Sequence, residues 1–248
     1  MTRRPQDGPA LRPAAGPVAG PAVGLVVAKA PVPGRVKTRL GASAGPEAAA
    51  RLAAAALLDT LDACVSAFGA ARCYLALDGD LADAADAEHL TAAMASWTVL
   101  PQRGDGFAAR LTHAHRDVAA KAHAPVVQVG MDTPQATGED LRRVADRLHD
   151  GADAVLGPAE DGGWWVLGLA RPAWADALTG VEMSTARTGA ETRAALEAAG
   201  AVVVTGPSMR DVDDVDDAAH VAELAPDTRF AQCWALCSEQ ALAAGVRR

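Results

Sequence analysis

Short apolar runs alternate along the chain with longer, Ala- and Leu-rich stretches in which apolar positions recur at helical spacing. The apolar runs predict buried strands, and the amphipathic stretches between them predict helices. Strands are expected at 22–27, 72–77, 97–100, 125–129, 154–156, 164–167 and 201–205. Helices are expected at about 46–68, 82–94, 107–121 and 190–199, from Thr137 in a capping-box pattern, and at the C-terminus. This alternation predicts an α/β fold, a three-layer α/β/α sandwich with a mostly parallel central sheet.

The length of the chain, 248 residues, fits one α/β domain, which we expect to span residues 21–248. Residues 1–20 carry three arginines, but prolines interrupt the segment and leave no apolar core for a signal peptide. We therefore interpret this segment as a disordered leader. No apolar run reaches membrane-spanning length, so the sequence predicts no membrane partner.

Composition narrows the class of partner. The net charge is -8 and only 4% of the residues are aromatic, whereas nucleic-acid-binding proteins usually present a basic face or interleaved aromatic and basic side chains. We expect a small anion as the partner and no nucleic acid. The four cysteines lack Cys-x-x-Cys spacing, so they are predicted to be buried thiols of a cytoplasmic protein. They are Cys64, Cys73, Cys233 and Cys237, of which the last two could face each other on one helix.

A basic loop, residues 28–40, directly follows the first predicted strand. Its four cations are Lys29, Arg35, Lys37 and Arg39. Two prolines and Gly34 restrict the path of the loop and hold the cations together despite their mutual repulsion. Ligands of open α/β sheets bind at the carboxyl ends of the strands, so the basic loop predicts a phosphate-binding site. The alternative is a solvated turn with scattered surface ion pairs.

Carboxylates follow two later predicted strands. Asp132 lies between Gly130 and Pro134, directly after strand 125–129, and the acidic loop 211–214 follows strand 201–205. Two carboxylates together with the phosphates of a ligand suit Mg²⁺. We therefore predict that Asp132 and Asp213 bind one Mg²⁺. An ordinary turn aspartate at 132 and a solvated helix cap at 211–214 are the alternative interpretations.

Four motifs, in this order along the chain, resemble those of the selenodomain-associated transferase family. They are KAPVPGRVKTRL at 29–40, GMDTP at 130–134, DGGWWVLGL at 161–169 and DVD at 211–213. The resemblance implies the GT-A fold of the nucleotide-diphospho-sugar transferase superfamily. It also implies a transferase, because members are commonly labelled glycosyltransferases and are similar to guanylyltransferases that build the deazaflavin cofactor.

The resemblance further implies that the loop after the first strand holds nucleotide phosphates and that the loop after strand 97–100 reads the base. Arg35 and Lys37 would contact the phosphates, and Asp132 and Asp213 would hold Mg²⁺. The other residues predicted to bind the nucleotide are Lys29, Gly34, Arg39, Gln102, Gly104, Gly162 and Gly163.

Three functions are compatible with these residues. In nucleotidyl transfer from a nucleoside triphosphate, Lys37 and Arg35 neutralise the leaving pyrophosphate. A phosphorylated acceptor, with a second pKa of about 6, needs no protein base, and this function is slightly favoured. Glycosyl transfer from a nucleotide sugar to a small soluble acceptor needs a base, for which Asp161 is the candidate, although Asp161 and its two glycines could equally form a turn between strands. The third function is nucleotide binding without turnover.

Overall fold

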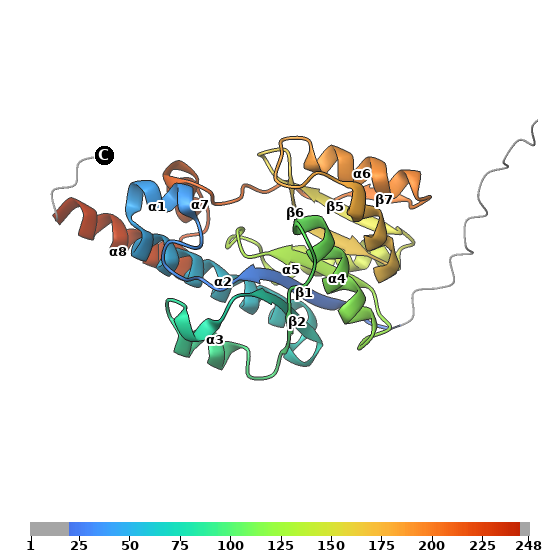
Figure 1. Ribbon diagram of the computed structural model, residues 1–248, viewed down its shortest axis with the longest axis horizontal. Coiled ribbons are helices and arrows are strands. Elements are labelled where there is room, and N and C mark those ends of the chain that lie inside the picture. The colour runs from blue at the N-terminus through green and yellow to red at the C-terminus, as the bar shows by residue number, and fades with distance from the viewer. Residues whose placement is uncertain (1–19, 244–248) are drawn as a thin grey trace, which may run out of the picture.

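The computed structural model describes residues 20–243, which form a central sheet with helices on both faces (Figure 1). The predicted leader lies outside the described residues, apart from Gly20, and so do the last five residues of the predicted domain. The strands are β1 (Val23–Lys29), β2 (Cys73–Asp78), β3 (Thr98–Pro101), β4 (Val126–Gly130), β5 (Ala154–Pro158), β6 (Trp164–Leu169) and β7 (Val203–Thr205). Each of the seven falls on a strand expected from the sequence, with bounds shifted by a few residues at most.

The sheet has the order β3-β2-β1-β4-β6-β5-β7. Strand β6 runs antiparallel to both β4 and β5, and every other pair is parallel. The predicted fold class is therefore confirmed. In the register of the sheet, Lys29 lies opposite Asp78 and Val27 lies opposite Gly130, so the carboxyl ends of β1, β2 and β4 meet at one edge. This edge carries the basic loop and Asp132.

Two apolar clusters fill the space between the sheet and its helices. On one face, side chains of β1 such as Val26 pack against helices α2 (Pro46–Phe68), α3 (Ala87–Ala93) and α5 (Gly138–His149). On the other face, Leu25 and Val27 pack against α4 (Phe107–Ala119), α6 (Thr188–Ala198) and the 3-10 segment Pro172–Gly180. Strands covered on both faces are apolar at nearly every position, which explains why the apolar runs predicted them well.

A third apolar cluster lies at one end of the molecule, where Figure 1 shows α1 (Thr38–Ala44), α7 (Val215–Leu224) and α8 (Arg229–Ala243) gathered beside α2. It joins Leu40 of α1, Leu52 of α2, Val212 of the acidic loop and Phe230 of α8. The cluster therefore fixes the ends of the basic loop and of the acidic loop relative to each other. Within residues 20–243, no helix is both long and apolar enough to cross a membrane.

The structure differs from the sequence prediction in four helical regions. The helix expected at 82–94 is shorter, because Asp86 takes a left-handed backbone conformation (φ 58°) just before α3 begins. The end of the basic loop forms α1, and Pro172–Gly180 forms an unpredicted 3-10 segment. Two C-terminal helices replace the single expected one, since a capping box on Asp214 begins α7 separately from α8.

Candidate functional site

The basic loop takes a constrained path between β1 and α1. The amide of Ala85 donates to the carbonyl of Pro31, and the amide of Arg35 donates to Val32 in a tight turn. Gly34 has a φ of 76°, and Lys37, directly before α1, has the left-handed conformation φ 45°, ψ 50°. A non-glycine residue in this region costs roughly 1 kcal/mol or more, so surrounding contacts must hold Lys37 there.

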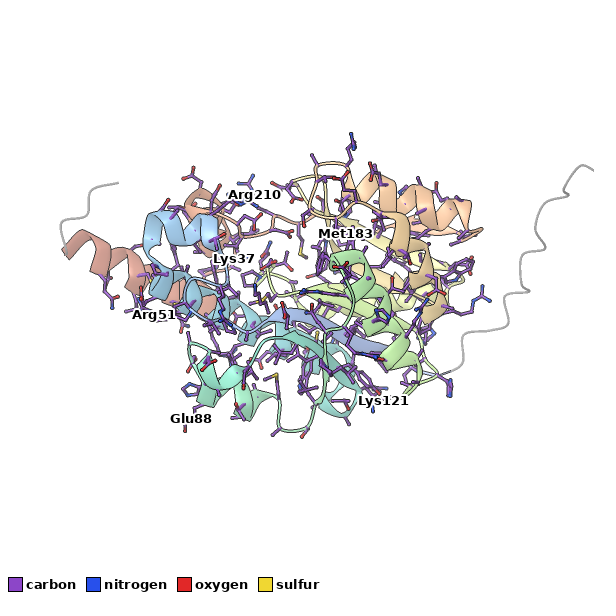
Figure 2. All side chains as sticks on the ribbon, viewed as in Figure 1. Lys37, Arg51, Glu88, Lys121, Met183 and Arg210 are labelled. Atoms are coloured by element: carbon purple, nitrogen blue, oxygen red, sulfur yellow. The ribbon has the colours of Figure 1, made fainter. Side chains whose placement is uncertain are left out.

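Those contacts are made by the Lys37 ammonium group, whose side chain is only 9% exposed. Its Nζ lies 2.5 Å from Oδ1 of Asp132 and 3.5 Å from Oδ1 of Asp213, and it donates to the carbonyl oxygen of Val212. Arg39 adds a second ion pair to Asp213, with 2.5 Å between Nη2 and Oδ2. We call Lys37, Asp132 and Asp213 the lysine–carboxylate cluster; Figure 2 labels Lys37 beside α1.

The backbone ties the two acidic segments of this cluster together. The amide of Val212 donates to the carbonyl of Asp132 at 2.9 Å, so the acidic loop lies alongside the loop that follows β4. Within the acidic loop, Asp214 caps α7 by accepting from the amides of Asp216 and Asp217. The helix-cap interpretation is thus correct for Asp214, whereas the Asp213 side chain turns toward Lys37.

Asp211 belongs to the same region, although the sequence did not single it out as a site residue. Within the described residues, its buried Oδ1 has no hydrogen-bond partner. Burial, reinforced by the charges of Asp132 and Asp161, raises the pKa of Asp211 to about 7. The signal in the sequence was the spacing of Asp211 and Asp213, because alternate residues of an extended segment point to the same side.

An open cavity of about 410 Å³ lies beside the cluster. The predicted site residues that line it are Lys29, Arg35, Lys37, Arg39, Gln102, Asp132 and Asp213. Two further charged residues line it that the sequence did not indicate: Asp78, at the end of β2, and Arg110 of α4, which pair at 2.9 Å. Gln102 uses its amide group to donate to the carbonyls of Ala28 (2.9 Å) and Ala76 (3.0 Å).

The other predicted residues are not among those that line this cavity. A Cβ on Gly104 would meet Ala109 at 2.9 Å, so packing on α4 requires a small residue there. Asp161 accepts from the amide of Gly163 at 2.8 Å in the turn between β5 and β6, and the Gly162 carbonyl accepts from the amide of Gly189 at 2.9 Å. Gly162 has a φ of 91°, and a Cβ there would lie 2.1 Å from the carbonyl oxygen of Ala186. The binding roles of these residues remain predictions.

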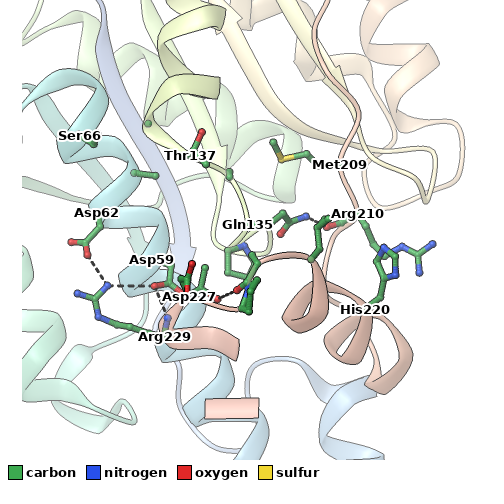
Figure 3. A pocket seen from close by; sticks show the side chains of 18 of the residues that line it. Asp59, Asp62, Ser66, Gln135, Thr137, Met209, Arg210, His220, Asp227 and Arg229 are labelled. Carbon is green, nitrogen blue, oxygen red and sulfur yellow. Dashed lines mark hydrogen bonds and ion pairs between the residues drawn. The ribbon is translucent and has the colours of Figure 1, made fainter. Parts of the chain in front are cut away.

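A larger cavity of about 770 Å³ lies between α2, the start of α5 and the α7–α8 connection (Figure 3). Its charged groups largely neutralise one another: Arg229 pairs with Asp62 at 2.6 Å and with Asp59 at 3.3 Å. Arg210 likewise pairs with Glu160 at 2.7 Å. Burial raises the pKa of Asp59, which accepts from the amides at the start of α8. These contacts secure α8, and they distinguish this cavity from the one beside the lysine–carboxylate cluster.

The lysine–carboxylate cluster fits a divalent cation only in partnership with a ligand. Among residues 20–243 no group of three or more His, Cys, Asp or Glu side chains is arranged to hold a metal. Asp132 and Asp213 nevertheless converge on one cation, the Lys37 ammonium. Mg²⁺ is commonly bound by one or two carboxylates, with substrate phosphates and water completing its octahedral shell. The donor set therefore suits a phosphate-bound Mg²⁺.

One known family model matches this chain. The model of a family described as "Uncharacterized protein conserved in bacteria (DUF2064)" matches residues 60–185, just over half of the sequence. The chain belongs to the DUF2064 family. The matched segment of this DUF2064 protein includes Asp132 and Asp161, while the basic loop and the acidic loop lie outside it. A search of curated proteins finds no match.

Solved structures confirm the fold. A protein from Desulfovibrio desulfuricans G20, assigned by name to the nucleotide-diphospho-sugar transferases, is 26% identical with a TM-score of 0.73, over 90% of this chain and 95% of that one. A cytidylyltransferase from Leptospira borgpetersenii is 11% identical (TM-score 0.53), covering 92% of this DUF2064 chain and 98% of its own. CMP:2-keto-3-deoxy-manno-octonic acid synthetase, complexed with CTP, is 13% identical (TM-score 0.51), with 84% and 98% covered. The narrower selenodomain-associated resemblance stays a prediction.

Proposed function

We propose that this protein is a Mg²⁺-dependent transferase that acts on an activated nucleotide, and that it transfers a nucleotidyl group from a nucleoside triphosphate to a small phosphorylated acceptor. One observation carries the proposal: the cations of the basic loop and the carboxylates of Asp132 and Asp213 line the same cavity at the carboxyl edge of the sheet. A triphosphate with its metal needs both kinds of group in one place. The Desulfovibrio transferase supports the class, and the two cytidylyl-transferring structures support the fold.

The lysine–carboxylate cluster supports Asp132 and Asp213 as the ligands of the metal. Asp132 and Asp213 would hold Mg²⁺, which when bound neutralises phosphate charge and polarises the phosphoryl group under attack. Lys37 and the metal compete for the same carboxylate oxygens, because the ammonium already pairs with both aspartates. A metal there would leave Lys37 free to turn toward the phosphates, where with Arg35 it would stabilise the charge on the leaving pyrophosphate.

Gln102 is the residue that we expect to read the base. Its amide nitrogen donates to two backbone carbonyls, those of Ala28 and Ala76. An amide NH₂ has two hydrogens, so only the side-chain oxygen remains for a ligand. Gln102 therefore accepts from an N–H group of the base. Lys29 and Arg39 line the same cavity and hold the phosphates by charge.

We expect the acceptor to carry a phosphate group, because such an acceptor needs no base from the protein. A phosphate monoester is largely deprotonated at neutral pH, since its second pKa is about 6, and it attacks without a protein base. Asp161 would be the base in the alternative, glycosyl transfer from a nucleotide sugar. Its Oδ1 already accepts from Gly163 within its own turn, which favours the nucleotidyl reaction.

The first experiment measures thermal stabilisation by nucleoside triphosphates and nucleotide sugars, with and without Mg²⁺, because a ligand of the native state raises the apparent stability. Asp132→Asn tests the metal site. Asp146→Asn, on the exposed face of α5, is the charge-matched control. Metal-dependent stabilisation by one triphosphate, absent from Asp132→Asn alone, is the expected result.

Three other outcomes would support a different function or contradict the proposal. A response only to nucleotide sugars supports glycosyl transfer. Binding that survives in Asp132→Asn and in Asp213→Asn, without pyrophosphate release from any triphosphate and phosphorylated acceptor, supports a binding protein without turnover. No response to either class of nucleotide contradicts the proposal.

A further inference from the structure

Two cysteines of α8 form a thiol pair outside the cavity of the candidate site. Cys233 and Cys237 lie one helical turn apart and face α2, where Arg51 donates from Nη2 to Sγ of Cys237 at 3.6 Å. Figure 2 shows Arg51 at this end of the molecule. Both thiols line an open cavity of about 570 Å³ whose other charged residues are Arg51, Asp86 and Arg229. Cys233 is half-buried, which corrects the expectation that all four thiols are buried, and Cys237 is 8% exposed.

The contacts of Cys237 favour its thiolate. A hydrogen bond from the Cys233 thiol and the nearby Arg51 guanidinium lower the pKa of Cys237, against the effect of burial, to about 6. The same hydrogen bond raises the pKa of Cys233, so one thiol of the pair stays protonated. Reactive cysteines are found in such electropositive, partly open surroundings.

The other two cysteines provide an internal comparison. Burial raises the pKa of Cys64 well above its usual range and that of Cys73 to about 12. Cys64 is fully buried in the core, and Cys73 donates its thiol hydrogen to the carbonyl of Gly69. Neither lines the cavity of the thiol pair. Packing alone therefore explains Cys64 and Cys73, whereas Cys237 also accepts from Arg51, which donates to Gln240 as well, at 3.2 Å.

We propose that the thiol pair is a thiol–disulfide exchange site for low-molecular-mass disulfides, with Cys237 as the attacking thiolate and Cys233 as the resolving thiol. The Cys237 thiolate attacks one sulfur of the disulfide RSSR, which breaks its S–S bond, forms a mixed disulfide and releases RS⁻. Cys233 then gives its proton to solvent and attacks the Cys237 sulfur, forming the Cys233–Cys237 disulfide and releasing the second RS⁻. Two protein thiols are oxidised while RSSR is reduced to two thiols, so the electrons balance.

Helix geometry makes the product labile. Residues one turn apart in an α-helix have Cα atoms roughly 6 Å apart, inside the range that a disulfide spans. Their Cβ atoms are farther apart than in an unstrained disulfide, so α8 must distort and the bond is easily reduced again. The distortion reaches the candidate site, because Cys237 belongs to the same apolar cluster as Leu40 and Val212.

Intact-protein mass spectrometry during incubation with hydroxyethyl disulfide at pH 7 tests the proposal. We expect the wild type to lose two mass units through an internal disulfide, and Cys233→Ser to accumulate one mixed disulfide at residue 237. Cys237→Ser should react at least tenfold more slowly than wild type. Arg51→Gln should lower the thiolate fraction of Cys237 at pH 7 about tenfold, measured by the ultraviolet absorbance of the thiolate, since a thiol pKa about two units higher leaves about a tenth of the thiol ionised. Arg147→Gln, an exposed arginine of α5, is the matched control.

Peptide mapping decides between the outcomes. Modification of Cys64 or Cys73 at the rate of Cys237 overturns the proposal, as does an unreactive wild type. An equal thiolate fraction in Arg51→Gln and wild type removes the role of the arginine. Circular dichroism of each variant confirms that it is folded. Oxidation of the wild type should lower its melting temperature and dithiothreitol should restore it; an unchanged melting temperature would contradict the link to the apolar cluster.

Discussion

The lysine–carboxylate cluster and the 161–163 turn both looked like ligand sites in the sequence, but they are built in opposite ways. The cluster joins Lys37, Asp132 and Asp213 from three separate loops. In the turn, Asp161 accepts from Gly163, and the backbone of Gly162 packs against Ala186 and accepts from Gly189. Ionic groups from distant segments gathered at one open cavity suit a polar ligand, whereas backbone contacts already account for the residues of the turn. The comparison therefore favours function at the cluster and a structural role at the turn.

The largest expected effect separates the two aspartates. Asp132→Asn should lower nucleotidyl transfer by about 100-fold or more, the scale of losing a group that stabilises transition-state charge. Asp161→Asn should lower it by less than about tenfold, well under the cost of removing a general base. Pyrophosphate release measured at saturating Mg²⁺ checks both. Equal losses in the two variants would break the comparison.

A change at Gly162 tests the structural side of the comparison. Gly162→Ala should destabilise the fold by about 2 to 3 kcal/mol, because the backbone is left-handed and the new Cβ would clash with Ala186. Gly34→Ala should cost only about 1 kcal/mol, since φ is also positive there but no described atom lies within 4 Å of the added Cβ. Urea denaturation measures both. A smaller loss of unfolding free energy in Gly162→Ala than in Gly34→Ala would mean that the 161–163 turn adjusts to the added Cβ.

Lys37→Met probes the competition inside the cluster. Without the ammonium, a divalent cation no longer has to displace a partner from Asp132 and Asp213. We expect its affinity to rise about tenfold, which corresponds to about 1.4 kcal/mol, while turnover falls. Calorimetric titration with Mn²⁺ in the absence of nucleotide measures the affinity. Lys29→Met is the control, because Lys29 lines the cavity but makes no ion pair among the described residues. A weaker cation affinity in Lys37→Met would show that the lysine assists the metal instead of competing.

The smallest effect is expected at the rim of the cluster. Arg39 pairs with Asp213, but its side chain is 74% exposed. Arg39→Gln should therefore change the free energy of unfolding by less than about 1 kcal/mol, and less still at high salt. Urea denaturation at two salt concentrations checks this. A loss as large as that of Gly162→Ala would place Arg39 among the groups that hold the fold.

Much of the fold could be predicted because its signals are local. Apolar runs located the strands, and the helix expected at about 46–68 is observed at Pro46–Phe68. The capping box at Thr137 and Asp140 is present as predicted. The 3-10 segment Pro172–Gly180 had no such periodic signal, and its stability comes from packing on α4, where Thr112 donates to the carbonyl of Ala175. Contacts of that kind depend on the assembled fold.

From the amino-acid sequence alone we could predict the alternation of strands and helices, the stiff basic loop after the first strand and the carboxylates that follow later strands. These depend on side-chain periodicity and on the backbone limits of Pro and Gly, which act over a few residues. Only the tertiary structure decided which charges meet: Arg39 and Asp213 are 174 residues apart in the chain and form an ion pair. It also separated Asp213, which turns to Lys37, from Asp214, which caps a helix. Electrostatic energy depends on distance in space, and sheet order and helix packing set that distance.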